Sequence, residues 1–215
     1  MKIIFAGGGT GGHLMAGLSI AQEISSRFPD TRVIFFGTDR NKESRYIEES
    51  NYEFKPIMAC KPTSFIRLPL FAFASLIGII HSLINLFIIK PDIIIGLGGY
   101  GSALPVVAAY IIGIPIVLIE PNVIPGRANL KMERWADAVI CHWESSKKRF
   151  KKGEVAVTGV PIRSGILENQ TEVDNNPFGL DSQKKTLLIM GGSQGAQTIN
   201  KVMLQSIPKL QTLVP

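Results

Sequence analysis

The 215-residue sequence lacks several features that would define a function by themselves. Its two cysteines, Cys60 and Cys141, lie far apart in apolar segments, which argues against a zinc site and favours buried thiols in a reducing compartment. No G-x-x-x-x-G-K-[ST] segment occurs, so the sequence does not support P-loop ATPase chemistry. No Asp-x-Asp pair occurs either, so a divalent metal held by carboxylates on a nucleotide-sugar is unsupported. We therefore expect neither a metal nor a cofactor.

Charged residues are few, at 19% of the chain, but basic ones prevail and give a net charge of +6. A basic balance favours anionic partners such as nucleotide-sugars, acidic lipid surfaces or nucleic acid. The basic run at 147–152 lacks the interleaved aromatic residues of a single-strand binder. We interpret it as a solvated helix end and expect no nucleic acid partner. The first residues lack a signal-peptide pattern, so we expect no secretory leader.

Short β-branched runs alternate with longer helical stretches along most of the chain. This alternation predicts βα units, and hence an α/β fold with a parallel sheet that is covered on both faces. The predicted strands are Lys2–Ala6, Arg32–Gly37, Asp92–Leu97, Pro115–Glu120, Ala138–Cys141 and Glu154–Thr158, with a weaker one near Phe54–Met58.

The composition changes in the last quarter of the chain. We expect residues 1–163 to form one Rossmann-like domain, residues 164–185 to be a polar linker, and residues 186–215 to open a second Rossmann-like domain. In that last segment a strand at Thr186–Met190 precedes a glycine turn and a helix. One βα unit cannot close a core, so we expect the sequence to be truncated relative to a two-domain protein.

The segment Leu68–Ile89 has no Asp, Glu, Lys or Arg over about the length that crosses a bilayer. Three interpretations stay open: a crossover helix largely buried against the sheet, a helix lying in a membrane surface, and a true membrane span. Its position between two strands of one sheet argues against the span. Arg67 and Lys90 bracket the segment and Lys61 lies just before it, which suits contact with anionic lipid.

Two glycine-rich turns each follow a predicted strand and open a helix. The first, at residues 7–13, matches G-x-G-x-x-G and ends in His13, while the second spans residues 96–102. Such turns aim backbone N–H groups at a phosphate or a sugar diphosphate. Because the carboxyl ends of parallel strands meet at one edge of a sheet, we expect the two turns to face one cleft. Asp39, after the second strand, is placed like the ribose-binding acid of a dinucleotide fold.

Polar residues follow other strands as well. Glu120 and Asn122 come at the end of a strand, where they suit sugar hydroxyls, although a loop cap explains the pair too. Arg163 follows a Gly-Val-Pro-Ile segment and is a candidate clamp for a diphosphate, or simply a solvated arginine.

In combination, these motifs resemble the MurG family, the N-acetylglucosaminyltransferases that convert lipid I to lipid II in peptidoglycan synthesis. The matching segments, in order along the chain, are Gly8–His13, Gly98–Tyr100, Glu120-x-Asn122, Gly159-x-Pro-x-Arg163 and Gly191–Ala196. The resemblance implies a GT-B fold and an enzyme peripheral to the cytoplasmic face of the bacterial inner membrane. It implies UDP-N-acetylglucosamine, lipid I and an anionic membrane surface as partners.

The resemblance also assigns roles to individual residues. His13 would be the general base, and the residues that bind the donor would be Thr10, Gly11, Gly12, Asn122, Arg163 and Ser193. The residues that support the cleft would be Gly99, Tyr100, Glu120 and Gln194. Two departures from the family pattern concern Ile119 and Pro121, where the family usually has His and Gln, and Met15–Gly17, where it usually has proline nearby.

Two other classes of function also remain open. A Rossmann-type NAD-dependent oxidoreductase would explain the first glycine turn and Asp39, but not the other motifs. A non-catalytic module that binds a membrane or a partner is compatible with a truncated chain. From the chain as given we expect little transferase activity, because an incomplete donor site loses the binding energy that orients the sugar.

Overall fold

The computed structural model describes residues 1–8, 11–38, 43–58, 68–163, 166, 178–181, 183–191 and 195–213, with backbone alone at 43, 68–70 and 211–213. The chain separates into two units, Met1–Glu168 and Asn169–Pro215. In chain order the elements of the first unit are β1 (Lys2–Gly7), α1 (Gly11–Arg27), β2 (Arg32–Gly37), α2 (Glu43–Glu49), β3 (Glu53–Pro56), α3 (Leu68–Ile89), β4 (Ile93–Gly98), α4 (Tyr100–Ile111), β5 (Ile116–Glu120), α5 (Arg127–Met132), η2 (Glu133–Trp135), β6 (Ala138–Cys141), α6 (Glu144–Lys147) and β7 (Glu154–Val157).

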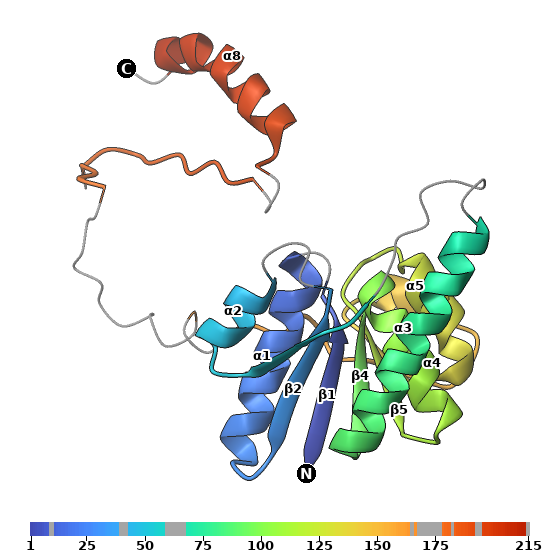
Figure 1. Cartoon of the computed structure of the whole chain (residues 1–215). Coiled ribbons are helices and arrows are strands. Elements are labelled where there is room, and N and C mark those ends of the chain that lie inside the picture. Colours follow the sequence, from blue (N-terminus) through green and yellow to red (C-terminus); the bar gives the residue numbers. More distant parts are fainter. Residues whose placement is uncertain are drawn as a thin grey trace. The chain divides into compact units, whose positions relative to one another are not determined.

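The first unit is built on one seven-stranded sheet in the order β3-β2-β1-β4-β5-β6-β7. All six neighbouring pairs are parallel. Helices α1 and α2 cover one face of the sheet, and α3, α4 and α5 lie on the other (Figure 1). The predicted α/β fold class is therefore confirmed. Each predicted strand of this unit forms within two residues of its expected bounds.

Alternating side chains of the strands build two core layers, as expected for a sheet covered on both faces. In β1, Phe5 packs with Phe35 and with Leu14 of α1, and the Phe5 and Phe35 rings stack with centroids 5.0 Å apart. Ile4 points to the opposite layer, which includes Val106 of α4. Side chains of β1 are therefore packed on both faces of the sheet. This buried packing fixes the carboxyl ends of the central strands on two sides.

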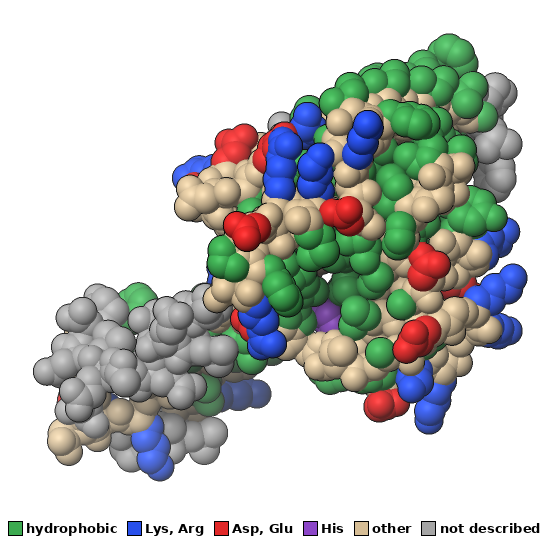
Figure 2. All heavy atoms as spheres, turned by 90° about the horizontal axis from the view of Figure 1, so that it is seen from below, with side chains coloured by type: hydrophobic (Ala, Val, Ile, Leu, Met, Phe, Trp, Pro, Cys, Tyr) green, Lys and Arg blue, Asp and Glu red, His purple; other side chains and the backbone are tan. Residues whose placement is uncertain are grey.

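Helix α3 is a crossover from β3 to β4, but the interpretation of a largely buried helix is wrong. The stretch Phe71–Ile89 is long and apolar enough to cross a membrane by length and composition alone, and 22% of it is buried within the protein. The reason is that α4 occupies the sheet face, and α3 packs mainly on α4. Figure 2 shows hydrophobic side chains gathered on this side of the surface, with basic side chains beside them. We call the exposed apolar residues Phe73, Leu76, Ile77, Ile80, Ile84, Phe87 and Ile88 the α3 face.

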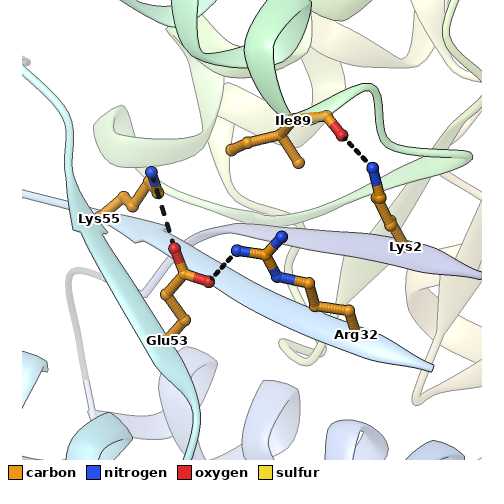
Figure 3. Close-up of polar contacts among 5 residues, drawn as sticks. All are labelled: Lys2, Arg32, Glu53, Lys55 and Ile89. Carbon is orange, nitrogen blue, oxygen red and sulfur yellow. Dashed lines mark hydrogen bonds and ion pairs between the residues drawn. The ribbon is translucent and has the colours of Figure 1, made fainter. Parts of the chain in front are cut away.

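The end of α3 is attached to the amino-terminal edge of the sheet. The Lys2 ammonium donates a hydrogen bond of 2.8 Å to the carbonyl oxygen of Ile89, one of the last carbonyls of the helix (Figure 3). On neighbouring strands, Arg32 pairs with Glu53 at 2.6 Å, and Lys55 lies 3.6 Å from the same carboxylate. The Arg32 guanidinium, with a smaller effect of Lys55, lowers the pKa of Glu53. Basic groups therefore gather where α3 returns to the sheet.

The second unit contains α8 (Gln197–Leu213), the helix predicted after the third glycine turn. The predicted strand at Thr186–Met190 does not form: the backbone there pairs with no strand among the described residues, and Leu188 and Met190 are about three-quarters exposed. A β-strand needs a neighbour to satisfy its N–H and C=O groups, and the described part of this unit has no other strand. Strand propensity alone is therefore not enough to form a strand in the described part of this unit.

Candidate active site

The two predicted glycine turns meet at the carboxyl ends of β1 and β4. A Cβ atom on Gly7 would lie 2.6 Å from the carbonyl oxygen of Gly98 and 2.9 Å from Cβ of Ser102. Gly7 and Gly98 also have φ angles of 103° and 93°, which L side chains rarely adopt. Glycine is thus required at Gly7 by the close approach of the Gly98 backbone and by its φ angle, and at Gly98 by its φ angle.

His13 lies in the first turn of α1 and points toward the second glycine turn. A Cβ on Gly98 would lie 3.3 Å from Cδ2 of His13, so the imidazole packs against that backbone. Burial lowers the pKa of His13, and the nearby Glu120 carboxylate partly opposes this shift. The histidine at the helix start is therefore kept largely neutral near pH 7, the state that can accept a proton.

Glu120 is fully buried at the end of β5, and protein donors occupy both of its carboxylate oxygens. Oε1 accepts hydrogen bonds of 2.9 Å from the backbone N–H and the side-chain amide of Asn122. Oε2 accepts from the N–H of Gly126 at 2.9 Å and from the Asn129 amide at 3.0 Å. The carboxylate thus caps its own loop, which supports the loop-cap alternative over a direct contact with sugar hydroxyls for this residue.

Asn122 is the link between this buried carboxylate and His13. Its Nδ2 lies 2.9 Å from Glu120 Oε1 and 3.4 Å from His13 Nε2. Because a carboxylate can only accept, the side-chain nitrogen of Asn122, rather than its oxygen, must face Glu120. An amide nitrogen can only donate, so Nε2 of His13 presents its lone pair to Asn122. The arrangement favours the neutral tautomer of His13 that carries its proton on Nδ1.

A hollow of about 530 Å³ opens beside these residues. Its walls come from α1, from the loops after β5 and β6, and from the segment after β7. The lining residues are Gly12, His13, Met15, Ala16, Ser19, Pro121, Asn122, His142, Trp143, Val160, Pro161, Ile162, Arg163 and Ile166. It is therefore a partly apolar recess at the carboxyl ends of parallel strands, where ligands bind in open α/β sheets.

The structure brings together part of the predicted site. Gly12, His13, Asn122 and the exposed Arg163 line one hollow. Gly11, Gly99 and Tyr100 are not among the lining residues, although Gly99 directly precedes α4 as its N-cap. Of the remaining predicted residues, Thr10, Ser193 and Gln194 lie outside the described residues, as do Asp39, Lys61 and Arg67.

His142 and Trp143 line the hollow and escaped the sequence analysis. Both directly follow β6, so the rule that ligands bind at the carboxyl ends of strands would have found them. The Trp143 indole N–H donates to the carbonyl oxygen of Pro121 at 3.0 Å, which joins the loops after β5 and β6. Among the residues that the structure describes, no group of three or more His, Cys, Asp or Glu side chains is placed to hold a metal ion.

The sheet, the two apposed glycine turns and the hollow define a Rossmann-like ligand-binding domain. The sequence model of the glycosyltransferase family 28 N-terminal domain matches residues 3–141, and the chain belongs to this family. This membership confirms the family resemblance reached from the motifs. It argues against the NAD-dependent oxidoreductase that the first glycine turn alone left open.

Curated relatives match nearly the whole chain. The UDP-N-acetylglucosamine--N-acetylmuramyl-(pentapeptide) pyrophosphoryl-undecaprenol N-acetylglucosamine transferase of Thermodesulfovibrio yellowstonii is 36% identical over 99% of this chain and 59% of its own length. The protein of the same name from Geotalea uraniireducens is 37% identical over 98% of this chain and 58% of its own length. The chain thus spans somewhat more than half the length of these relatives.

A solved structure supports the fold. MurG of Acinetobacter baumannii superposes with a TM-score of 0.64 at 23% identity, over 75% of this chain and 46% of that one. This likeness, at its low identity, shows the arrangement of helices and strands and nothing about the ligand.

Proposed function

We propose that this chain provides the acceptor-side part of an inverting N-acetylglucosaminyltransferase of peptidoglycan synthesis. The donor would be UDP-N-acetylglucosamine, and the acceptor would be the C4 hydroxyl of the N-acetylmuramyl group of lipid I. The observation that carries the proposal is the contact of His13 with Asn122 inside the hollow, with His13 packed against the glycine turn after β4. The names of the curated relatives supply the donor and the acceptor.

In this proposal His13 is the general base. The lone pair on Nε2, which now faces the Asn122 amide, would take the proton of the attacking hydroxyl. That hydroxyl oxygen forms a bond to the anomeric carbon while the bond to the UDP oxygen breaks, which inverts the configuration and gives a β-1,4 link. The lowered pKa of His13 keeps the base unprotonated at neutral pH.

The other predicted residues would bind rather than react. Asn122 would contact the N-acetylglucosamine, and its amide is already oriented by the buried Glu120. Gly11 and Gly12, with Thr10, would present backbone N–H groups at the amino-terminal end of α1, a 17-residue helix whose dipole favours negative charge there. Arg163 and Ser193 would hold the diphosphate of the donor, with Gly99, Tyr100 and Gln194 supporting the cleft.

The proposal extends to the location of the protein. We infer that the α3 face lies on the anionic cytoplasmic surface of the inner membrane, so that a lipid-linked acceptor reaches the hollow. The exposed apolar residues of α3 and the lysines at its end suit the interface between headgroups and acyl chains. The buried Leu86 and the bond from Lys2 to Ile89 tie α3 to its own domain, which favours a peripheral helix over a membrane span.

The test combines acceptor binding with turnover. A soluble lipid I analogue, added to the chain without UDP-N-acetylglucosamine, is expected to shift the imidazole NMR signals of His13 and the side-chain amide signals of Asn122. With labelled UDP-N-acetylglucosamine present, any disaccharide formed should fall about 10²–10⁴-fold in His13→Ala, the usual contribution of a general base. Absence of acceptor binding, or measurable product that is equal for wild type and His13→Ala, would contradict the proposal.

A further inference from the structure

His142 is a buried histidine of the hollow for which the proposed reaction has no role. It directly follows β6, and its backbone N–H donates to the carbonyl oxygen of Glu120 at 3.1 Å. The residue is 4% exposed, and it lines the same hollow as His13, Asn122 and Arg163. Its position is therefore set by the pairing of β5 with β6 and not by a surface loop.

The imidazole of His142 has no hydrogen-bond partner in the described part of the chain. Its Nδ1 is buried and unpaired. Buried polar atoms in folded proteins nearly always have a partner, and those without one often mark a functional role. His81 on α3 also has a buried, unpaired Nδ1, but it does not line the hollow. The unpaired ring together with the position in the hollow indicates that His142 serves something other than packing.

The groups around His142 determine whether its ring is protonated. The negative charge of Glu120 on β5 favours its protonated form, while His13 on α1 disfavours it. Arg163 lines the same hollow, and α6, which follows His142, carries Glu144 and Lys147. Burial has the largest effect and lowers the pKa of His142. The ring is thus largely neutral near pH 7, and an anion placed in the hollow would favour its charged form.

We propose that His142 takes up a proton from solvent and donates a hydrogen bond to a phosphate oxygen when a diphosphate-bearing ligand occupies the hollow. The inference deepens the proposed function, since both proposed substrates carry a diphosphate. No covalent bond forms or breaks in this step. The proton from solvent goes to His142 rather than to the neighbouring Glu120. Four protein hydrogen bonds already occupy the oxygens of Glu120, whereas the ring of His142 has a free nitrogen.

The proposal fixes the sign of a pH effect. The pKa of His142 is higher with the diphosphate bound than without it, so affinity is greatest at pH values below the free pKa. Affinity then falls as pH rises from the free pKa to the bound pKa, by about tenfold per pH unit for one linked proton. Above the bound pKa it becomes constant.

The experiment uses the 215-residue chain and two probes without metal, UDP and geranyl diphosphate, which represent a nucleotide and a lipid-linked source of the same group. The chain has three histidines, so NMR titration of the imidazole signals gives the pKa of each, with and without the probe. Affinities are measured by calorimetry between pH 5 and pH 8. The variants are His142→Gln, and His81→Gln on α3 as a matched control outside the hollow.

We expect at least one probe to raise the pKa of His142, and His142→Gln to weaken binding several-fold at pH 6 while flattening the pH slope. His81→Gln should leave both unchanged. A wild-type His142 pKa that neither probe moves would overturn the proposal, even if the Gln variant failed to fold. The measurement requires no turnover, so it is separate from the test of the transferase. If the acceptor is not glycosylated but His142 still takes up a proton, only the proposed transferase function is overturned.

Discussion

The side-chain amide of Asn122 lies 3.4 Å from Nε2 of His13, although the two residues are 109 positions apart in the sequence. The same amide is held at 2.9 Å by the buried carboxylate of Glu120. A negative charge on β5 therefore orients a neutral donor, and the donor faces the imidazole. The protonation state of His13 depends on both residues, which gives the first prediction.

Replacing Asn122 with Asp should raise the pKa of His13, because a carboxylate within a few ångströms favours the imidazolium. The measurement is an NMR titration of the three histidines. Asn85→Asp on α3, where the Asn85 amide donates to the His81 carbonyl oxygen, is the control and should leave His13 unchanged. An unaltered His13 pKa in Asn122→Asp would mean that the contact does not persist in solution.

Glu120→Gln should destabilise the first unit by about 1–3 kcal/mol, because the Gln amide brings hydrogens to a site that already holds four donors. Urea denaturation measures this change in the free energy of unfolding. Glu144→Gln is the matched exposed variant, and we expect it to stay within about 0.5 kcal/mol of wild type. Equal midpoints for the two variants would contradict the role of Glu120 as a loop cap.

Gly7→Ala and Gly12→Ala should have opposite effects on stability. At Gly7 the new Cβ meets the Gly98 carbonyl oxygen at 2.6 Å and the backbone has φ 103°, so we expect a loss of at least about 1–3 kcal/mol. At Gly12, inside α1, no atom lies within 4 Å of the new Cβ, and alanine should be neutral or stabilising by up to about 1 kcal/mol. Thermal unfolding of both variants measures these changes in stability. Equal losses of stability in the two variants would show that the two glycine turns do not touch.

Acidification should destabilise the first unit through two histidines. The folded-state pKa values of His13 and His142 are both lowered by burial, so the unfolded chain binds more protons below about pH 6.5. The free energy of unfolding should fall as pH drops below that value and become independent of these groups once pH is below their folded-state pKa values. Denaturation midpoints from pH 8 to pH 5 measure this trend, and it should be weaker in His142→Gln. If the stability of His142→Gln depends on pH as steeply as that of wild type, His142 does not contribute to the acid destabilisation.

The α3 face should bind anionic vesicles. Phe87 and Ile88 are 62% and 72% exposed, so changing both to Ser should weaken cosedimentation with phosphatidylglycerol vesicles while leaving stability nearly unchanged. Leu86→Ala, at a buried neighbour, should instead cost about 2–5 kcal/mol of stability. Wild-type protein that fails to bind these vesicles even at low salt would remove the membrane surface from the proposed function.

Much of the fold was predictable because its signals are local. The β-branched runs of β1, β2, β4 and β5 are buried on both faces, so they appear in the sequence as nearly continuous apolar segments. The meeting of the two glycine turns followed from the parallel strands alone, since the carboxyl ends of such strands share one edge.

What escaped prediction depends on tertiary packing. Helix α3 is apolar all round, so its sequence has no polar stripe to show which side faces solvent, and only the presence of α4 on the sheet decides this. Glu120 sits in a motif that suits sugar binding as well as a loop cap, and its complete burial distinguishes the two. His142 has no motif around it, and its importance comes from the neighbours that the fold provides.

The hydrogen bond from the Trp143 indole to the Pro121 carbonyl also has a spectroscopic consequence. The chain has two tryptophans, and Trp143 lines the hollow at 45% exposure, whereas Trp135 packs near Tyr110 and below Arg134. Emission of Trp143 should therefore respond to anything that enters the hollow, while Trp135 provides a constant background that Trp135→Phe removes. The protein thus carries its own fluorescent reporter, and unlabelled ligands can be screened against it directly.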